Sequence, residues 1–148
     1  MADLFNGQYY HSIDSKGRLI IPAKFRDILG SQFKIGVSLD PCLYLYSNEG
    51  FAAFYEKLQA IPSNKAGARK LIRYFMSGTF DVELDKQGRI LVPQQLRRNG
   101  MSGDVVLVGN GSHVELWTAA EFEKELPSDV RLEAGQIADE LFGEGIMI

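Results

Sequence analysis

Residues 14–22, "DSKGRLIIP", and residues 85–93, "DKQGRILVP", are two copies of one nine-residue motif, 71 positions apart. The same offset holds over about 45 positions, as an internal duplication requires. It pairs Gly7 with Gly78, Gly17 with Gly88, Pro22 with Pro93, Val37 with Val108, Leu45 with Leu116 and Phe51 with Phe122. We therefore expect a first unit at residues 5–56, a helical connector at 57–75, a second unit at 76–126 and an acidic C-terminal tail at 127–148.

Each motif predicts a strand, a tight turn, a second strand and a helix. "QYYHSI" and "TFDVEL" alternate and are rich in aromatic and β-branched residues, which is typical of strands. An aspartate followed three residues later by a glycine is typical of a tight turn, because Asp can accept a backbone N–H and Gly adopts a positive φ without steric cost. "RLII" and "RILV" are apolar after the arginine, so we expect a strand buried on both faces. A proline then begins a short helix that ends at a glycine, in residues 22–30 and 93–100.

The rest of each unit predicts two further strands and a closing helix. The strands fall within residues 33–47 and 104–118, and the helices begin after Ser47 and Thr118. A unit of about 50 residues buries too little surface to be stable alone, so the two copies should pack together. The expected fold is α+β and β-rich, with one pseudo-two-fold β-barrel core and short peripheral helices.

Composition describes an ordinary folded protein: 45% of the residues are hydrophobic and 24% are charged. No apolar run is long enough to cross a bilayer, the first residues lack signal-peptide character, and Cys42 is the single cysteine. We therefore expect a cytoplasmic protein with no membrane partner. The net charge of −3 is unevenly distributed along the chain, because residues 1–71 carry a net charge of +3 and residues 72–148 one of −6.

The basic residues gather around the first motif. Residues 14–26 hold Lys16, Arg18, Lys24 and Arg26 against one acid, Asp14. An aspartate and an arginine that flank a tight turn can pair, which fixes the direction of the guanidinium before any ligand arrives. On spacing alone, a structural clamp that binds nothing is the favoured interpretation of such a pair.

The pattern Asp-x-x-Gly-Arg, two or three apolar residues, Pro, three residues and Arg resembles the DNA-binding element of the SpoVT/AbrB swapped-hairpin regulators. Two such elements in one chain of this length resemble the MraZ family in particular. The likeness covers about Asn6 to Leu126 and includes "DSKGRLIIPAKFRD", "RKLIRYFMSG" and "DKQGRILVPQQLRR". The units are then tandem SpoVT/AbrB-like units.

The resemblance implies a sequence-specific transcriptional regulator that binds short G-rich direct repeats in double-stranded DNA. The promoter would be that of a cell-division and cell-wall gene cluster, and the chains would assemble into a ring-like homo-oligomer in the cytoplasm, associated with the nucleoid. The implied DNA-binding residues are Arg18, Lys16, Lys24, Arg26, Arg89 and Arg97. Asp14, Gly17, Asp85 and Gly88 would orient the motif, and the first unit, which has more lysines, would carry more of the binding.

Two alternatives stay open from the residues alone. One is a ring-forming scaffold for other proteins, in which the Asp/Arg pairs are purely structural. The other is a phosphoester hydrolase that uses Asp14 and Asp85, but a base, a nucleophile and a metal cluster are missing from the pattern. His11 and His113 stand apart from other ligand-type residues, so we expect no metal, cofactor, small-molecule substrate or enzymatic activity.

Overall fold

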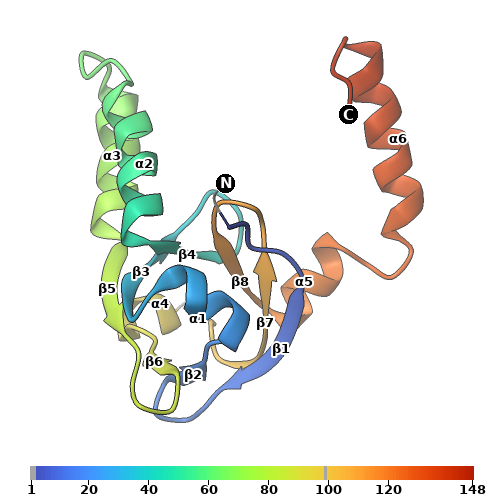
Figure 1. The fold of residues 1–148 in the computed structure, drawn as a ribbon. Coiled ribbons are helices and arrows are strands. Elements are labelled where there is room, and N and C mark those ends of the chain that lie inside the picture. Colours follow the sequence, from blue (N-terminus) through green and yellow to red (C-terminus); the bar gives the residue numbers. More distant parts are fainter. Residues whose placement is uncertain (1–2, 99) are drawn as a thin grey trace.

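The computed structural model describes residues 3–98 and 100–148. Strands come in consecutive pairs separated by one or two helices, and their ladders are antiparallel, which gives an α+β fold (Figure 1). The strands are β1 Gln8–Ile13, β2 Arg18–Ile20, β3 Gln32–Val37, β4 Leu43–Ser47, β5 Thr79–Glu83, β6 Arg89–Leu91, β7 Gly103–Gly109 and β8 Val114–Thr118. The helices are α1 Ala23–Leu29, α2 Asn48–Gln59, α3 Ala66–Ser77, α4 Gln94–Arg97, α5 Ala119–Glu125 and α6 Val130–Gly143. The predicted elements are present, and Asn99, at the end of the helix predicted over 93–100, lies outside the described residues.

Six strands form one antiparallel sheet in the order β1-β7-β8-β4-β3-β5, and β2 pairs with β6 in a separate two-stranded ribbon. The predicted barrel is wrong, because the six-stranded sheet is open. Closure would need its edge strands β1 and β5 to pair with each other. Each edge strand instead runs into a turn that leads to the β2–β6 ribbon, which lies at the lower end of the molecule in Figure 1 and contributes Leu19 and Ile90 to the core.

The register shows a pseudo-two-fold axis that relates the two units. In the ribbon, Leu19 faces Ile90, and in the sheet Tyr44 faces Glu115. Both pairs join positions 71 residues apart, the offset of the repeat. The units also exchange strands, since β1 of the first unit pairs with β7 of the second and β3 pairs with β5. The two copies therefore form one intertwined core, as the short unit length predicted.

The prediction that β2 and β6 are buried on both faces is also wrong. Leu19 and Ile90 point inward and are almost fully buried, but Ile20 is 47% exposed and Leu91 is 58% exposed. A strand in a two-stranded ribbon has only one covered face when a single layer packs against it. The inward residues join a core that includes Phe25, whose ring makes edge contacts with Phe5 and Tyr9 at 5.6 and 5.0 Å between centroids.

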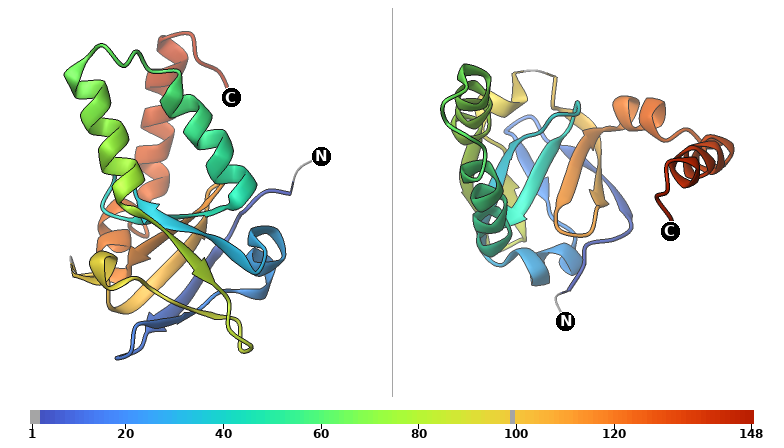
Figure 2. Two further views of the ribbon diagram at one scale, coloured as in Figure 1. Left: turned by 90° about the vertical axis from the view of Figure 1, so that its left-hand side faces the viewer. Right: turned by 90° about the horizontal axis from the view of Figure 1, so that it is seen from above.

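Three helices are longer than the short peripheral helices predicted. α2 and α3 have 12 residues each and form a hairpin that projects from the sheet, while α6 has 14 residues and stands on the opposite flank (Figures 1 and 2). Ser47 begins α2 by accepting the Gly50 N–H at 3.0 Å, and Thr118 begins α5 by accepting the Glu121 N–H at 3.3 Å. Within the described residues, none of the helices has the length and apolarity needed to cross a bilayer.

Candidate nucleic-acid interface

The first motif forms a tight turn held by one carboxylate. Asp14 Oδ1 accepts the backbone N–H groups of Lys16 and Arg18 at 3.0 and 2.9 Å, and Oδ2 accepts Arg18 Nε at 2.7 Å. Asp14 N also donates to the Arg18 carbonyl at 3.0 Å, which closes the hairpin. These bonds, with that from the Arg18 backbone first, hold the pKa of Asp14 below its usual value of 3.8. The carboxylate is thus ionised at neutral pH and orients the guanidinium.

The second motif forms the same set of hydrogen bonds. Asp85 Oδ1 accepts the N–H groups of Gln87 and Arg89 at 2.8 and 2.9 Å, and Oδ2 accepts Arg89 Nε at 2.9 Å. The pKa of Asp85 is lowered for the same reason, with the Arg89 backbone N–H as the largest cause. In both motifs only Nε of the guanidinium is used by the aspartate. Within residues 3–98 and 100–148, the hydrogen bonds and ion pairs of Arg18 and Arg89 leave both terminal nitrogens of each guanidinium available to an external acceptor.

Each turn packs against the helix of the other unit, a relationship that sequence reasoning missed. A β-carbon at Gly17 would lie 2.5 Å from Cζ of Arg97, and one at Gly88 would overlap the Arg26 guanidinium. Both glycines also have positive φ, +85° and +76°. Arg97 Nε further donates to the Val92 carbonyl at 2.9 Å. Arg26 and Arg97, predicted to bind DNA, therefore lie against the turn glycines of the opposite unit.

Backbone bonds between the units complete this arrangement. Ile21 N donates to the Gly88 carbonyl at 2.9 Å, and Val92 N donates to the Gly17 carbonyl at 2.8 Å. The two turns are thereby fixed relative to each other and lie at the same end of the molecule, remote from α2 and α3 (Figure 2, lower tips in the left view).

The outward face of the ribbon brings the two arginines together. Arg18 pairs with Leu91, and Ile20 pairs with Arg89, so all four side chains share one face. Arg18 and Arg89 are diagonal neighbours, about 7–8 Å apart between Cα atoms. The arginines are partly exposed, 38% for Arg18 and 27% for Arg89. Ile20 and Leu91, which sequence reasoning placed in the core, form an exposed apolar centre between them.

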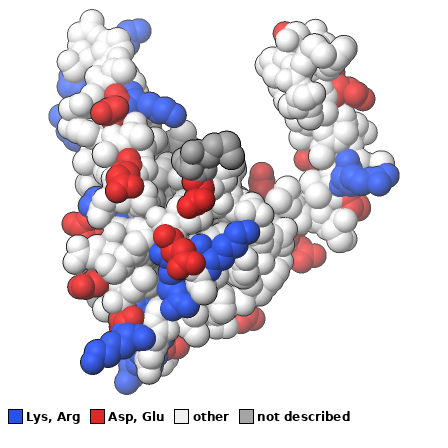
Figure 3. Space-filling view, viewed as in Figure 1, with Lys and Arg blue, Asp and Glu red and all other residues white. Residues whose placement is uncertain are grey.

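Lysines surround this face. Lys16 and Lys86 are exposed in the two turns, and Figure 3 shows Lys and Arg atoms gathered at the end of the molecule where the turns lie. Lys24 is exposed on α1 and donates to Asn6 Oδ1 at 2.9 Å. The structure therefore places Arg18, Arg89, Lys16 and Lys86 on the ribbon and its two turns as a basic face, whereas Lys24 lies on α1. Lys86 could have been found from the sequence because it stands in the second turn.

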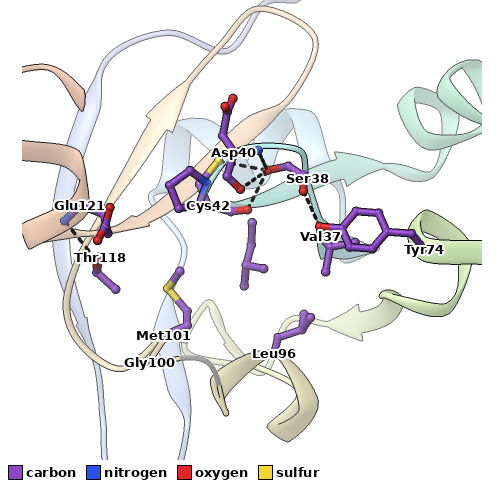
Figure 4. Close-up of a pocket in the computed structure, with 12 residues that line it drawn as sticks. Val37, Ser38, Asp40, Cys42, Tyr74, Leu96, Gly100, Met101, Thr118 and Glu121 are labelled. Carbon is purple, nitrogen blue, oxygen red and sulfur yellow. Dashed lines mark hydrogen bonds between the residues drawn. The ribbon is translucent and has the colours of Figure 1, made fainter. Parts of the chain in front are cut away.

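The remaining chemistry-bearing groups lie elsewhere. Ser38, Cys42, Tyr74 and Met101 line a cavity of about 450 Å³ between α3 and α4 (Figure 4). Ser38 Oγ donates to the Cys42 carbonyl at 2.8 Å, and burial raises the pKa of the Cys42 thiol to about 12. That thiol is protonated at neutral pH and is a poor nucleophile. The described residues contain no group of three or more His, Cys, Asp and Glu side chains placed to hold a metal ion.

Comparison with known proteins identifies the family. A family model described as "MraZ protein, putative antitoxin-like" matches the chain twice, over residues 4–74 and 75–143. The chain belongs to the MraZ family. The resemblance predicted from the two motifs is thus confirmed, and so is the duplication.

Relatives in the MraZ family cover most of the chain. A protein of Lachnoclostridium phytofermentans named transcriptional regulator MraZ is 50% identical over 121 residues, 81% of this chain and 85% of its own length. One of the same name from Moorella thermoacetica is 46% identical over 82% of this chain and 85% of its own length. Another, from Acetivibrio thermocellus, is 41% identical over 97% of this chain and the whole of its own length. The likeness to MraZ proteins therefore extends over both motifs and, in the last case, the C-terminal helix.

Proposed function

We propose that this chain is a sequence-specific DNA-binding transcriptional regulator that contacts double-stranded DNA through the outward face of the β2–β6 ribbon. One observation carries the proposal: two arginines, each oriented by an aspartate, lie on one exposed face with their terminal nitrogens unused by the turn. Family membership and the printed names of the relatives support it.

Arg18 is the main reader in this proposal. Its planar fork matches O6 and N7 of guanine in the major groove, and a G-rich operator supplies that acceptor pair. Orientation by Asp14 reduces the freedom that Arg18 loses on binding. Arg89 makes the equivalent contact more weakly, because it is the less exposed of the two and its turn has Gln87 where the first has Lys16.

The surrounding residues have supporting roles. Lys16, Lys86 and Lys24 neutralise phosphates. Arg26 and Arg97 pack against the turn glycines of the opposite unit. Ile20 and Leu91 lie where they can contact thymine methyl groups or sugars between the two arginines. Asp14, Gly17, Asp85 and Gly88 shape the turns and do not contact DNA.

The proposal includes the operator, the assembly and the location implied by the motif. Direct repeats are related by translation, so several copies of the chain, arranged head to tail, suit them better than the two-fold within one chain. We infer a ring-like homo-oligomer that acts without catalysis on promoter DNA of a cell-division and cell-wall cluster, in the cytoplasm at the nucleoid. The unit boundaries at 5–56, 57–75, 76–126 and 127–148 remain part of this proposal.

A binding titration tests it. Fluorescence anisotropy with a duplex of G-rich direct repeats, taken from the upstream region of the chain's own gene, should show tight binding by the wild type. Arg18→Ala should weaken it about five- to 150-fold, since a bidentate guanine contact contributes about 1–3 kcal/mol. Arg131→Ala on α6, remote from the ribbon, is the matched control and should bind normally. Unchanged binding by Arg18→Ala, together with a lower melting temperature, would favour the scaffold alternative with purely structural Asp/Arg pairs.

A further inference from the structure

A hollow of about 260 Å³ lies where the α2–α3 hairpin meets the sheet (Figure 1). Strands β3, β4 and β5 line it from the sheet, and α2 and α3 line it from the hairpin. We call it the aromatic pocket, because five of its lining residues are Tyr44, Tyr46, Phe51, Phe54 and Phe75. Drug-sized ligands occupy pockets of about 300–1,000 Å³, so this one suits a smaller molecule.

The five rings form one connected cluster. The centroid of the Tyr46 ring lies 5.9 Å from that of Tyr44, 5.9 Å from that of Phe51 and 5.6 Å from that of Phe54. The Phe75 ring meets the Phe54 ring edge to face, at 5.1 Å. Tyr46, Phe51 and Phe75 are buried, so packing holds their rings in place before any ligand arrives. The face of an aromatic ring is electronegative and attracts cations, and cages of such rings bind methylated ammonium groups.

The charge at the pocket has the sign that a cation requires. Among the described residues that line the pocket, Asp40 alone is charged, and it is exposed in the loop between β3 and β4. Burial raises the pKa of Tyr44 and of Tyr46 to about 12, so both hydroxyls are neutral at pH 7. The negative charges of Glu115 and Asp40 contribute to the raised pKa of Tyr44. The pocket therefore disfavours an anion.

The loop fixes the backbone of Asp40 and leaves its carboxylate available. Asp40 N donates to Ser38 Oγ at 3.2 Å, and the Asp40 carbonyl accepts Cys42 N at 2.8 Å. Within residues 3–98 and 100–148, the hydrogen bonds and ion pairs of the chain do not use the Asp40 carboxylate. It can thus serve as the counter-charge of a ligand.

We propose that the aromatic pocket binds a small, free organic cation of the methylated-ammonium class, with its ammonium group against the rings and beside the Asp40 carboxylate. Such a ligand gains cation–π attraction and covers apolar ring surface at the same time. The pocket shares no residue with the β2–β6 ribbon. The inference therefore goes beyond the proposed function and does not depend on DNA contact by Arg18.

A matched pair of probes tests the charge requirement. Choline and 3,3-dimethylbutan-1-ol have the same shape, but only choline carries a positive charge. In a saturation-transfer NMR titration of the full chain, choline should bind about two- to thirtyfold more tightly than the neutral alcohol. A wild type that does not bind choline, whether its pocket is empty or filled by another copy, would overturn the proposal. Equal affinities for the two probes would overturn it as well.

Phosphorylcholine distinguishes a free cation from a lipid headgroup. It should bind more weakly than choline, because its phosphate would lie near Asp40 with no basic lining residue to pair with it. Binding of phosphorylcholine as tight as that of choline would contradict the assignment to a free cation.

Two variants test the residues. Asp40→Asn keeps the size of an exposed side chain and should lower the affinity for choline but not for the neutral alcohol. Phe54→Leu keeps an apolar side chain but removes one ring, and it should also lower the affinity for choline. Asp27→Asn, exposed on α1 outside the pocket, is the control and should bind choline as the wild type does. Melting temperatures verify that each variant is folded. Choline binding that neither Asp40→Asn nor Phe54→Leu weakens would place the cation elsewhere and overturn the proposal.

Discussion

Leu19 and Ile90 face each other at the centre of the β2–β6 ribbon, and the pseudo-two-fold axis passes between them. Because these residues point into the core, their neighbours point outward, which places Arg18 and Arg89 symmetrically on the exposed face. The same internal repeat that forms the shared core therefore also places a pair of oriented arginines on the surface.

The apolar centre of this face should matter for DNA affinity more than for stability. Ile20→Ser or Leu91→Ser should change the free energy of unfolding by less than about 0.5 kcal/mol, since both side chains are exposed. Each should weaken binding to the repeat duplex about fivefold through loss of an apolar contact. Anisotropy titration measures the effect, and Leu39→Ser, in an exposed loop remote from the ribbon, is the control. Equal affinities for all three variants would show that Ile20 and Leu91 do not contribute to DNA binding.

The turn glycines should tolerate no side chain. Gly17→Ala requires a positive φ that disfavours alanine by about 1–2 kcal/mol, and its methyl group would displace Arg97. Gly88→Ala should be similarly destabilising through Arg26. Urea denaturation should show a lower free energy of unfolding for both variants. Gly135→Ala, in α6 with open space around it, should instead be neutral or stabilising. A Gly17→Ala protein as stable as the wild type would contradict the packing of Arg97 on the turn.

Local chemistry allowed much of this site to be predicted from the sequence. Asp14, Gly17 and Arg18 lie within five residues, so the turn and the ion pair follow from spacing, and the constant offset revealed the second copy. The contact of Arg97 with Gly17 could not be predicted, because it depends on how two units 71 residues apart intertwine. The exposure of Ile20 was missed for a related reason: a continuous apolar run does not tell whether one or two layers cover a strand. The predicted barrel was wrong because the edge strands β1 and β5 do not pair with each other, and tertiary structure decides that pairing.

The depressed pKa values of Asp14 and Asp85 predict an acid-sensitive fold. A carboxyl group whose pKa is lower in the folded state stabilises that state above its unfolded pKa, near 3.8, and loses this effect as the pH falls through the folded pKa. Urea midpoints should therefore fall as the pH is lowered from about 5 through the folded-state pKa of these carboxyl groups. The double variant Asp14→Asn with Asp85→Asn should show a shallower decline over this range, and an identical pH profile would rule out the carboxylates as a source.

Phe25 tests the shared core. Its ring is fully buried between Phe5 and Tyr9, so Phe25→Ala should lower the free energy of unfolding by about 3–5 kcal/mol. Because both units contribute to this core, unfolding should remain a single cooperative transition by circular dichroism and tryptophan fluorescence. Separate transitions at the two probes would show that the units fold independently.

The most direct test of guanine recognition by Arg18 is a titration with 7-deazaguanine, which lacks the N7 acceptor, in place of the guanines of the repeat. Wild type should bind the modified duplex about two- to tenfold more weakly than the natural one, because half of a bidentate contact worth about 1–3 kcal/mol is removed. The double variant Arg18→Ala with Arg89→Ala should bind both duplexes with equal, low affinity. A wild type indifferent to the modification, or a double variant that still discriminates, would contradict the account.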